Sequence, residues 1–246
     1  MRLKSIPSLK YAKALLALVG IVGFTASTQA STTVLWDFTG GSAAGVASGD
    51  DADQITANDA TIGPGISGTS QGGFSSVTNS TFYTASATTD TEAGAVADGD
   101  YIEFSFSVEP GYIFSVNSLN FTVGANTSAG VGAFTVTHFL RADAESSAYS
   151  TTLGSDSYDH AGDSNINVRW SAPFTINTSA NPDFSGLTSL TFRIYQHDTI
   201  NSTGAWGRGD NVSADITVIP EPAVLGLLLS LGAFAVVLVR RKRRSE

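Results

Sequence analysis

The stretch YIEFSFSVEPGYIFSVNSLNFTVG, residues 101–124, alternates apolar and polar side chains with a period of two. In its first half, Ile102, Phe104, Phe106 and Val108 fall on one face of an extended chain, and the residues between them fall on the other. This alternation predicts a β-strand with one buried face. Glu109-Pro110-Gly111 predicts a turn, after which the alternation resumes. The stretch therefore predicts two strands joined by a turn.

The same alternation recurs on both sides of this stretch. Between the recurrences lie clusters of Gly, Ser, Asn and Asp, which are typical of turns. The apolar sets are Val34, Trp36 and Phe38; Leu119, Phe121 and Val123; Phe134, Val136, His138 and Leu140; Leu190, Phe192 and Ile194; and Ile216 with Val218. Many short strands with polar connections predict an all-β fold, a single two-sheet β-sandwich of jelly-roll type over residues 31–218. Residues 43–99, rich in Gly, Ala, Ser, Thr and Asp, predict long surface loops with one or two edge strands.

The last part of the chain reads IPEPAVLGLLLSLGAFAVVLVRRKRRSE, residues 219–246. Residues 223–239 carry no charge, and five basic residues follow at once: Arg240, Arg241, Lys242, Arg243 and Arg244. An apolar helix of about 17 to 25 residues can cross a bilayer, and a basic cluster stays on the cytoplasmic side. Pro220 and Pro222 favour a stiff, extended and exposed peptide just outside the membrane. The tail predicts a transmembrane helix over 223–239 with residues 240–244 as its stop-transfer signal.

The first 30 residues are typical of a signal peptide. Arg2, Lys4, Lys10 and Lys13 precede a mainly apolar run, and small residues follow it in Thr28-Gln29-Ala30. Cleavage after Ala30 would leave Ser31 as the mature N-terminus; a cut a few residues earlier and an uncleaved anchor are the alternatives. Both ends of the chain thus predict export of the body between them.

The order of parts in the tail resembles the PEP-CTERM sorting signal: Pro220-Glu221-Pro222, an apolar segment and a terminal basic cluster. The resemblance covers residues 219–246 only. It implies a bacterial protein that is secreted, held briefly in the inner membrane, and cut near the motif by an exosortase, a membrane cysteine protease-transpeptidase. Delivery to the cell surface or the extracellular matrix would follow. An ordinary C-terminal membrane anchor is the alternative.

Four segments of the body resemble a secreted β-sandwich found ahead of PEP-CTERM tails. They are VLWDFTG at 34–40, the stretch at 101–124, GLTSLTFRIYQHDT at 186–199 and GAWGRGDNVSADITV at 204–218. The last segment is similar to a GTWRIDNV pattern through Trp206, Asp210, Asn211 and Val212, although Gly207-Arg208-Gly209 makes the spacing one residue longer. The resemblance implies a fold and an extracellular address, and it implies no enzyme activity.

Charge and composition exclude several functions for the body. Four of the thirteen Lys and Arg residues lie in the signal peptide and five in the tail, which leaves only Arg141, Arg169, Arg193 and Arg208. Twenty of the twenty-two acidic residues lie between them, so the net charge of residues 31–219 is −16. We expect no nucleic-acid partner, since such binding needs a basic surface. The chain has no Cys, which excludes thiol catalysis and thiolate metal sites.

The remaining chemistry gives few candidates. Glu103 and Glu109 supply the two carboxylates that a glycosidase needs, but a polar strand face and a turn favour a solvated role for them. His138 lies in an apolar strand face and is interpreted as a hydrogen-bonded core residue. We expect no cofactor. A structural Ca²⁺ site is open as an alternative, with Asp50, Asp51 and Asp53 as ligands, joined by Asp37 and Asp210 only if the first and last strands are neighbours.

Two functions follow from these observations. The first is a non-enzymatic protein of the envelope or extracellular polymer matrix, structural or weakly glycan-binding. Its stacking residues would be Trp170, Tyr195 and Trp206, with Arg169 or Arg193 as hydrogen-bond donors. The alternative is a secreted hydrolase acting on polysaccharide, in which two acids meet across a cleft.

Overall fold

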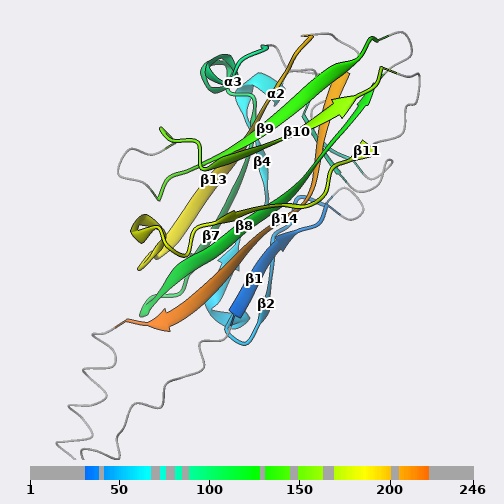
Figure 1. Ribbon diagram of the computed structural model, residues 1–246. Helices are drawn as coiled ribbons and strands as arrows, with labels where there is room; N and C mark the ends of the chain where they lie inside the picture. The colour runs from blue at the N-terminus through cyan, green and yellow to red at the C-terminus, as the bar shows by residue number, and fades with distance from the viewer. Residues whose placement is uncertain are drawn as a thin grey trace, which may run out of the picture.

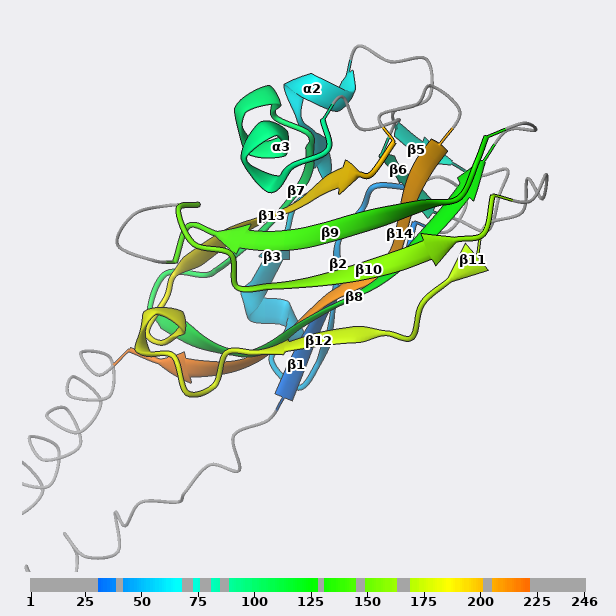
Figure 2. The same cartoon turned by 45° about the horizontal axis from the view of Figure 1, so that its top comes forward.

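The computed structural model describes residues 31–38, 42–67, 73–75, 81–84, 89–127, 131–144, 149–162, 169–200 and 205–221. Within these residues two antiparallel β-sheets pack face to face, which confirms the predicted β-sandwich (Figures 1 and 2). The signal peptide over residues 1–30 and the predicted transmembrane helix over 223–239 lie outside the described residues. The described residues contain no helix long and apolar enough to span a membrane.

Sheet A contains the first and last strands of the body. Its central order is β11-β8-β14-β1-β2, with β12 also paired to β8, β6 to β14, and β5 to β6. The strands are β1 (Ser31–Trp36), β2 (Val46–Gly49), β5 (Gly73–Ser75), β6 (Thr81–Thr84), β8 (Tyr112–Thr127), β11 (Arg169–Trp170), β12 (Phe174–Asn177) and β14 (Ala205–Pro220). Because Ser31 pairs with Thr217, the start of β1 and the end of β14 lie at the same end of the sandwich (Figure 1).

Sheet B has the order β10-β9-β13-β7-β3, with β4 also paired to β7. The strands are β3 (Ile55–Ala57), β4 (Thr61–Ile62), β7 (Tyr101–Val108), β9 (Phe134–Ala142), β10 (Gly154–His160) and β13 (Ser189–Asp198). β7 is the first half of the stretch that predicted the fold, and β8, its second half, belongs to the opposite sheet. The turn between them is as predicted: Gly111 has a φ of 92°, which glycine adopts readily, and Tyr112 N donates to Glu109 O at 3.2 Å.

The core lies between the sheets and consists of the apolar sets that the alternation predicted. Trp36 is its centre: the side chain is fully buried, its ring lies edge-on to Phe104 and Phe192, and its Nε1 donates to Asn58 O at 2.9 Å. Phe104 and Phe192 stack with ring centroids 5.2 Å apart. Such aromatic contacts stabilise a core beyond the burial of apolar area, and here they replace the disulfides that the chain lacks.

Residues 43–99 contain more structure than the sequence predicted. Besides the five short strands β2 to β6 they form two α-helices, α2 (Pro64–Ser67) and α3 (Glu92–Asp98), and a 3₁₀-helix, η2 (Ala52–Gln54); a second 3₁₀-helix, η3 (Pro182–Phe184), comes later. The prediction of loops with one or two edge strands was therefore wrong. α3 is short and Ala-rich, so no apolar periodicity in the sequence predicts it. Thr91 caps its N-terminus, and Gly99, at φ 76°, ends it. α3 packs against the outer face of sheet B (Figure 2).

Candidate functional site

The outer face of sheet B carries a row of charged side chains across its three central strands. β13 lies between β7 and β9, and the strand register places Arg193 opposite Glu103 on β7 and opposite Arg141 on β9. Two like charges on neighbouring strands destabilise a sheet unless each has its own counter-ion. Here each arginine reaches a different carboxylate, Glu103 or Glu92. Two of the four arginines of the body are thus concentrated at one place.

Arg193 is held between two tyrosines. Its guanidinium carbon lies 4.2 Å from the ring centroid of Tyr101 and 3.9 Å from that of Tyr149. Its Nε donates to Glu103 Oε2 at 2.8 Å, and the two side chains remain 24% and 28% exposed. Although burial opposes the charged form, hydrogen bonds to Tyr195 and Glu103 raise the pKa of Arg193. The guanidinium is therefore always charged and is fixed in the plane that stacking on both rings requires.

Tyr149 connects the two arginines. Its backbone has a φ of 60°, an uncommon conformation for a residue with a side chain, and its N–H donates to Ala142 O at 2.9 Å. In this position its ring covers Arg193 while its carbonyl oxygen accepts from Arg141 Nη1 at 2.9 Å. Burial, with the nearby charge of Asp143, raises the pKa of Tyr149 to about 12. Its hydroxyl therefore keeps its proton and can donate a hydrogen bond.

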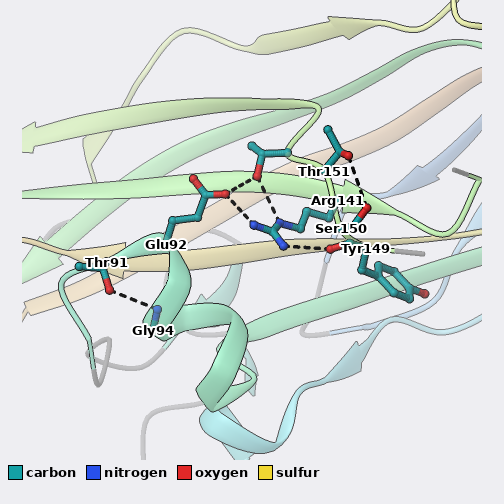
Figure 3. Close-up of polar contacts among 8 residues, drawn as sticks. Thr91, Glu92, Gly94, Arg141, Tyr149, Ser150 and Thr151 are labelled. Carbon is teal, nitrogen blue, oxygen red and sulfur yellow. Dashed lines mark hydrogen bonds and ion pairs between the residues drawn. The ribbon is translucent and has the colours of Figure 1, made fainter. Parts of the chain in front are cut away.

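Arg141 fastens α3 and the chain after β9 to the sheet (Figure 3). Its Nη2 donates to Glu92 Oε1 at 2.8 Å, and its Nε donates to Thr152 Oγ1 at 3.2 Å. Glu92 also accepts from the Thr152 hydroxyl. Hydrogen bonds from Thr152 and Arg141 lower the pKa of Glu92. Since Nε, Nη1 and Nη2 of Arg141 all bond within the protein, its role is structural.

Next to the charged row lies an aromatic row, Tyr101–Tyr195–Phe139, on the same three strands. Tyr195 stacks on Phe139 with centroids 5.0 Å apart, and Tyr101 contacts Tyr195 edge-on at 5.2 Å. Ala95 of α3 covers this row, and Tyr195 is only 2% exposed. Tyr195 and Arg193 do share the face opposite the core, as predicted, but Tyr195 cannot stack on a ligand, because α3 occupies its surface. Tyr101 and Tyr149, which the sequence did not single out, are the partly exposed aromatics.

The other predicted stacking residues do not join this site. Trp206 is half-buried in β14 and pairs with Asn126, so it belongs to sheet A. Arg169 and Trp170 form β11 of sheet A, and their side chains lie outside the described residues. Of the two predicted glycan contacts on sheet B, Tyr195 is covered and Arg193 remains partly exposed. The sequence contained a signal for the Arg193–Glu103 pair, since both residues occupy polar positions of predicted strands. No sequence pattern marks Tyr149.

The outer face of sheet A differs in chemistry. Asp215 accepts from Thr33 Oγ1 and Ser118 Oγ, each at 2.9 Å, and from Asn120 Nδ2 at 3.3 Å. Asn120 in turn accepts from Thr175 Oγ1 at 2.7 Å. This lattice across four strands consists of small polar side chains that bond to one another, so it offers a ligand neither an aromatic ring nor an uncommitted charge.

The proposed carboxylate pair of a glycosidase does not form. Glu103 faces outward in β7 with Arg193 as its partner, and Glu109 lies in the turn that follows the strand. Glu109 follows Glu103 by six residue steps along the chain, a span of about 20 Å in extended form. Glycosidase carboxyl groups lie about 5 to 9.5 Å apart. The two residues therefore cannot act on one glycosidic bond. Glu109 is exposed, as the solvated interpretation predicted, whereas Glu103 is paired with Arg193 instead.

A different pair of acids does come together. β1 and β14 are neighbours, with Trp36 opposite Val212, which is the condition that the sequence set for Asp37 and Asp210 to share a site. Burial, with the charge of Asp37, raises the pKa of Asp210 to about 6, although the Asn211 N–H, at 2.7 Å, opposes this shift. Nevertheless, no group of three potential metal ligands gathers in the part of the chain that the structure describes, the Asp50, Asp51 and Asp53 segment included.

His138 is fully buried on the core side of β9, opposite Gln196 and Asp156, as its place in an apolar strand face predicted. Burial, with the nearby His197, lowers the pKa of His138 to about 3. The imidazole is neutral at physiological pH and is inaccessible to a substrate.

The sorting motif is described only in its first half. Pro220 ends β14 and is exposed, and Glu221 follows it, half-buried, with its N–H donating to Gly111 O at 2.9 Å. The extended geometry predicted for this peptide holds for Ile219 and Pro220, but the free, exposed peptide does not, since both residues pair with β8 and Glu221 is bonded to the turn before it. Pro222, the apolar segment and the basic residues 240–244 lie outside the described part of the chain, as does Ala30.

Comparison with known proteins gives similarities of fold only. No protein-family model matches the sequence, and neither does any curated protein. Solved structures that align include the CBM27-1 module of Caldicellulosiruptor saccharolyticus in complex with mannohexaose, at 14% identity and TM-score 0.36, covering 74% of this chain and 95% of that one. The CBM22-1 xylan-binding domain of Paenibacillus barcinonensis aligns at 13% identity and TM-score 0.31, covering 76% and 94%.

An adhesin domain of Lys-gingipain from Porphyromonas gingivalis aligns at 14% identity and TM-score 0.31, covering 56% of this chain and 74% of that one. At these TM-scores we draw nothing about function from the similarities.

Proposed function

We propose that this chain is an exported, non-enzymatic surface or matrix protein whose sandwich binds neutral polysaccharide weakly through the outer face of sheet B. The binding site consists of Arg193, Glu103, Tyr101 and Tyr149, and we call it the arginine–tyrosine site. The C-terminal segment would hold the precursor in the inner membrane until an exosortase-like enzyme releases it. The sequence of both ends supports export of the protein, and the geometry of Arg193 supports polysaccharide binding.

The observation that carries the binding proposal is the immobilised, partly exposed guanidinium. Glu103 and the two tyrosine rings fix its plane, and in the described part of the chain no partner occupies its Nη2. A sugar presents hydroxyl acceptors and donors around an apolar ring face. Arg193 supplies donors, Glu103 supplies acceptors, and the tyrosines supply apolar edges with hydroxyl groups. Because these groups are already oriented, little entropy is lost when a sugar binds.

Charge selects the class of polysaccharide. With a net charge of −16 over residues 31–219, the body repels polyanions, and the positive charge of Arg193 is neutralised by Glu103 at 2.8 Å. A neutral polysaccharide is not repelled by this charge. Since only one small site makes the contacts, we expect affinities in the micromolar to millimolar range, which many copies on a surface would strengthen through multivalency.

Affinity electrophoresis and calorimetry against a panel of neutral polysaccharides test the proposal. The variant Arg193→Met should weaken binding at least tenfold, since it keeps the apolar stem and removes the donors. Thr33→Ala on sheet A is the control and should leave affinity unchanged. The proposal fails if the unmodified protein binds none of the panel, or if Arg193→Met binds as well as the parent.

The polysaccharide-hydrolase alternative has one observation in its favour, the carboxyl group of Asp210, whose pKa burial and the nearby Asp37 raise to about 6, because a carboxyl group with a raised pKa can act as a general acid. Assays for release of reducing sugar separate the two functions. Hydrolysis that Asp210→Asn abolishes would establish the enzyme, whereas binding without product release supports the binding protein.

A further inference from the structure

The last strand of the sandwich includes the first residues of the sorting motif. β14 continues through Ile219, opposite Ile113, to Pro220, opposite Tyr112. The next residue is still attached: Glu221 N donates to Gly111 O at 2.9 Å. The Pro-Glu half of Pro220-Glu221-Pro222 is therefore part of the folded body rather than of a free linker.

The turn between β7 and β8 creates this attachment. Gly111, at φ 92°, reverses the chain so that Tyr112 N bonds to Glu109 O, and the Gly111 carbonyl is then directed to β14. Proline lacks an N–H and is tolerated at the edge of a sheet. Pro220 meets this condition, because β1 begins at Ser31 opposite Thr217 and leaves the other side of β14 unpaired by β1 beyond that point.

The distance to the membrane is consequently very short. The apolar segment is expected to begin at Ala223, so only Pro222 separates it from the last attached residue, Glu221. One residue of extended chain spans about 3.5 Å. An enzyme that recognises its substrate as an added strand needs main-chain groups that are not already paired within a sheet. Ile219, Pro220 and Glu221 do not offer such groups while they are bonded to β8 and to Gly111.

We infer that the fold itself sets the upstream limit of processing: release cuts the chain on the membrane side of Glu221, and the released sandwich keeps Pro220 and Glu221. This inference rests on the proposed release by an exosortase-like enzyme. It assigns Pro220 and Glu221 of the motif to the end of β14, where pairing shields them from the enzyme.

Mass spectrometry of the full-length protein, produced in a host with the processing enzyme and recovered from the cell surface or medium, tests the inference. We expect every released C-terminus to lie at Glu221 or beyond it and before Glu246. A terminus at Pro220 or upstream overturns the inference but leaves release intact. An unprocessed Glu246 on all surface material refutes release, and the inference with it.

A pair of spacer variants separates shielding by the fold from selection by the motif. A six-residue Gly-Ser spacer between Ile219 and Pro220 moves the whole motif off the sandwich, and we expect termini upstream of Glu221 to appear. The same spacer between Glu221 and Pro222 is the matched control, and its termini should stay at Glu221 or beyond. If both variants end at the same motif residue as the parent, the motif alone selects the cut and the fold does not.

Discussion

The half-buried carboxyl group of Asp210 makes the stability of the sandwich depend on pH in an unusual direction. Its pKa is raised to about 6 from an ordinary 3.8, chiefly by burial and also by Asp37. A raised pKa means that the folded state binds the proton more tightly than the unfolded state does. The contribution to stability is therefore complete below about pH 4 and is lost as the pH rises through 6. Asp210→Asn should remove this dependence.

The size of this contribution to stability follows from the pKa shift of Asp210. About two pKa units correspond to about 3 kcal/mol, and solvent screening of a half-exposed group reduces this to about 1 kcal/mol. At pH 7 we expect Asp210→Asn to raise the free energy of unfolding by this amount, or the melting temperature by about 2 to 4 °C, and at pH 3.5 to change neither. The substituted amide keeps an oxygen for the Asn211 N–H, which donates to Asp210 Oδ1 at 2.7 Å.

Urea denaturation of the body at both pH values, monitored by tryptophan fluorescence, measures the effect. Asp37→Asn is the control and should give a smaller gain, since it removes only the second cause. A loss of stability at pH 7 would refute the reasoning. If that loss appears with CaCl₂ and disappears with EDTA, the two acids bind a cation, which is the role the sequence left open for them.

Two further predictions concern the core. Burial lowers the pKa of His138 to about 3, so its contribution to stability, complete above about pH 6.5, should be lost progressively as the pH falls toward 3, by a few kcal/mol in all. His138→Gln should flatten that part of a stability-against-pH curve, and an unchanged curve would exclude His138 as the cause. Trp36→Ala should destabilise the body by about 3 to 5 kcal/mol in urea denaturation, because it removes the central ring of the core. Trp36→Phe should cost less than Trp36→Ala, since it keeps an aromatic ring and loses the bond to Asn58 O and part of the buried ring volume; an equal cost would contradict a role for the ring in packing.

Much of the fold could be predicted because its strands carry a local signal. Residues such as Phe104 and Phe121 alternate with polar neighbours, and the period of two alone places them on a buried face. α3 and β10 gave no such signal. α3 is held by Thr91 and by the Glu92–Arg141 contact. β10 reads GSDSYDH, so apolar and polar residues do not alternate along it. Their structure is decided by what they pack against.

The sequence by itself determined the sandwich, the acidic disulfide-free body, the outward position of Arg193 and the prediction of an exported chain with a membrane-directed tail, because periodicity, charge and apolar length are properties of neighbouring residues. Only the tertiary structure decided which of these residues meet. Strand register set Arg193 beside Glu103, a turn set Tyr149 over it, and α3 covered Tyr195. The pairing of β14 with β8 attached Glu221 to the body. Such contacts join segments far apart in the chain, and no local pattern records them.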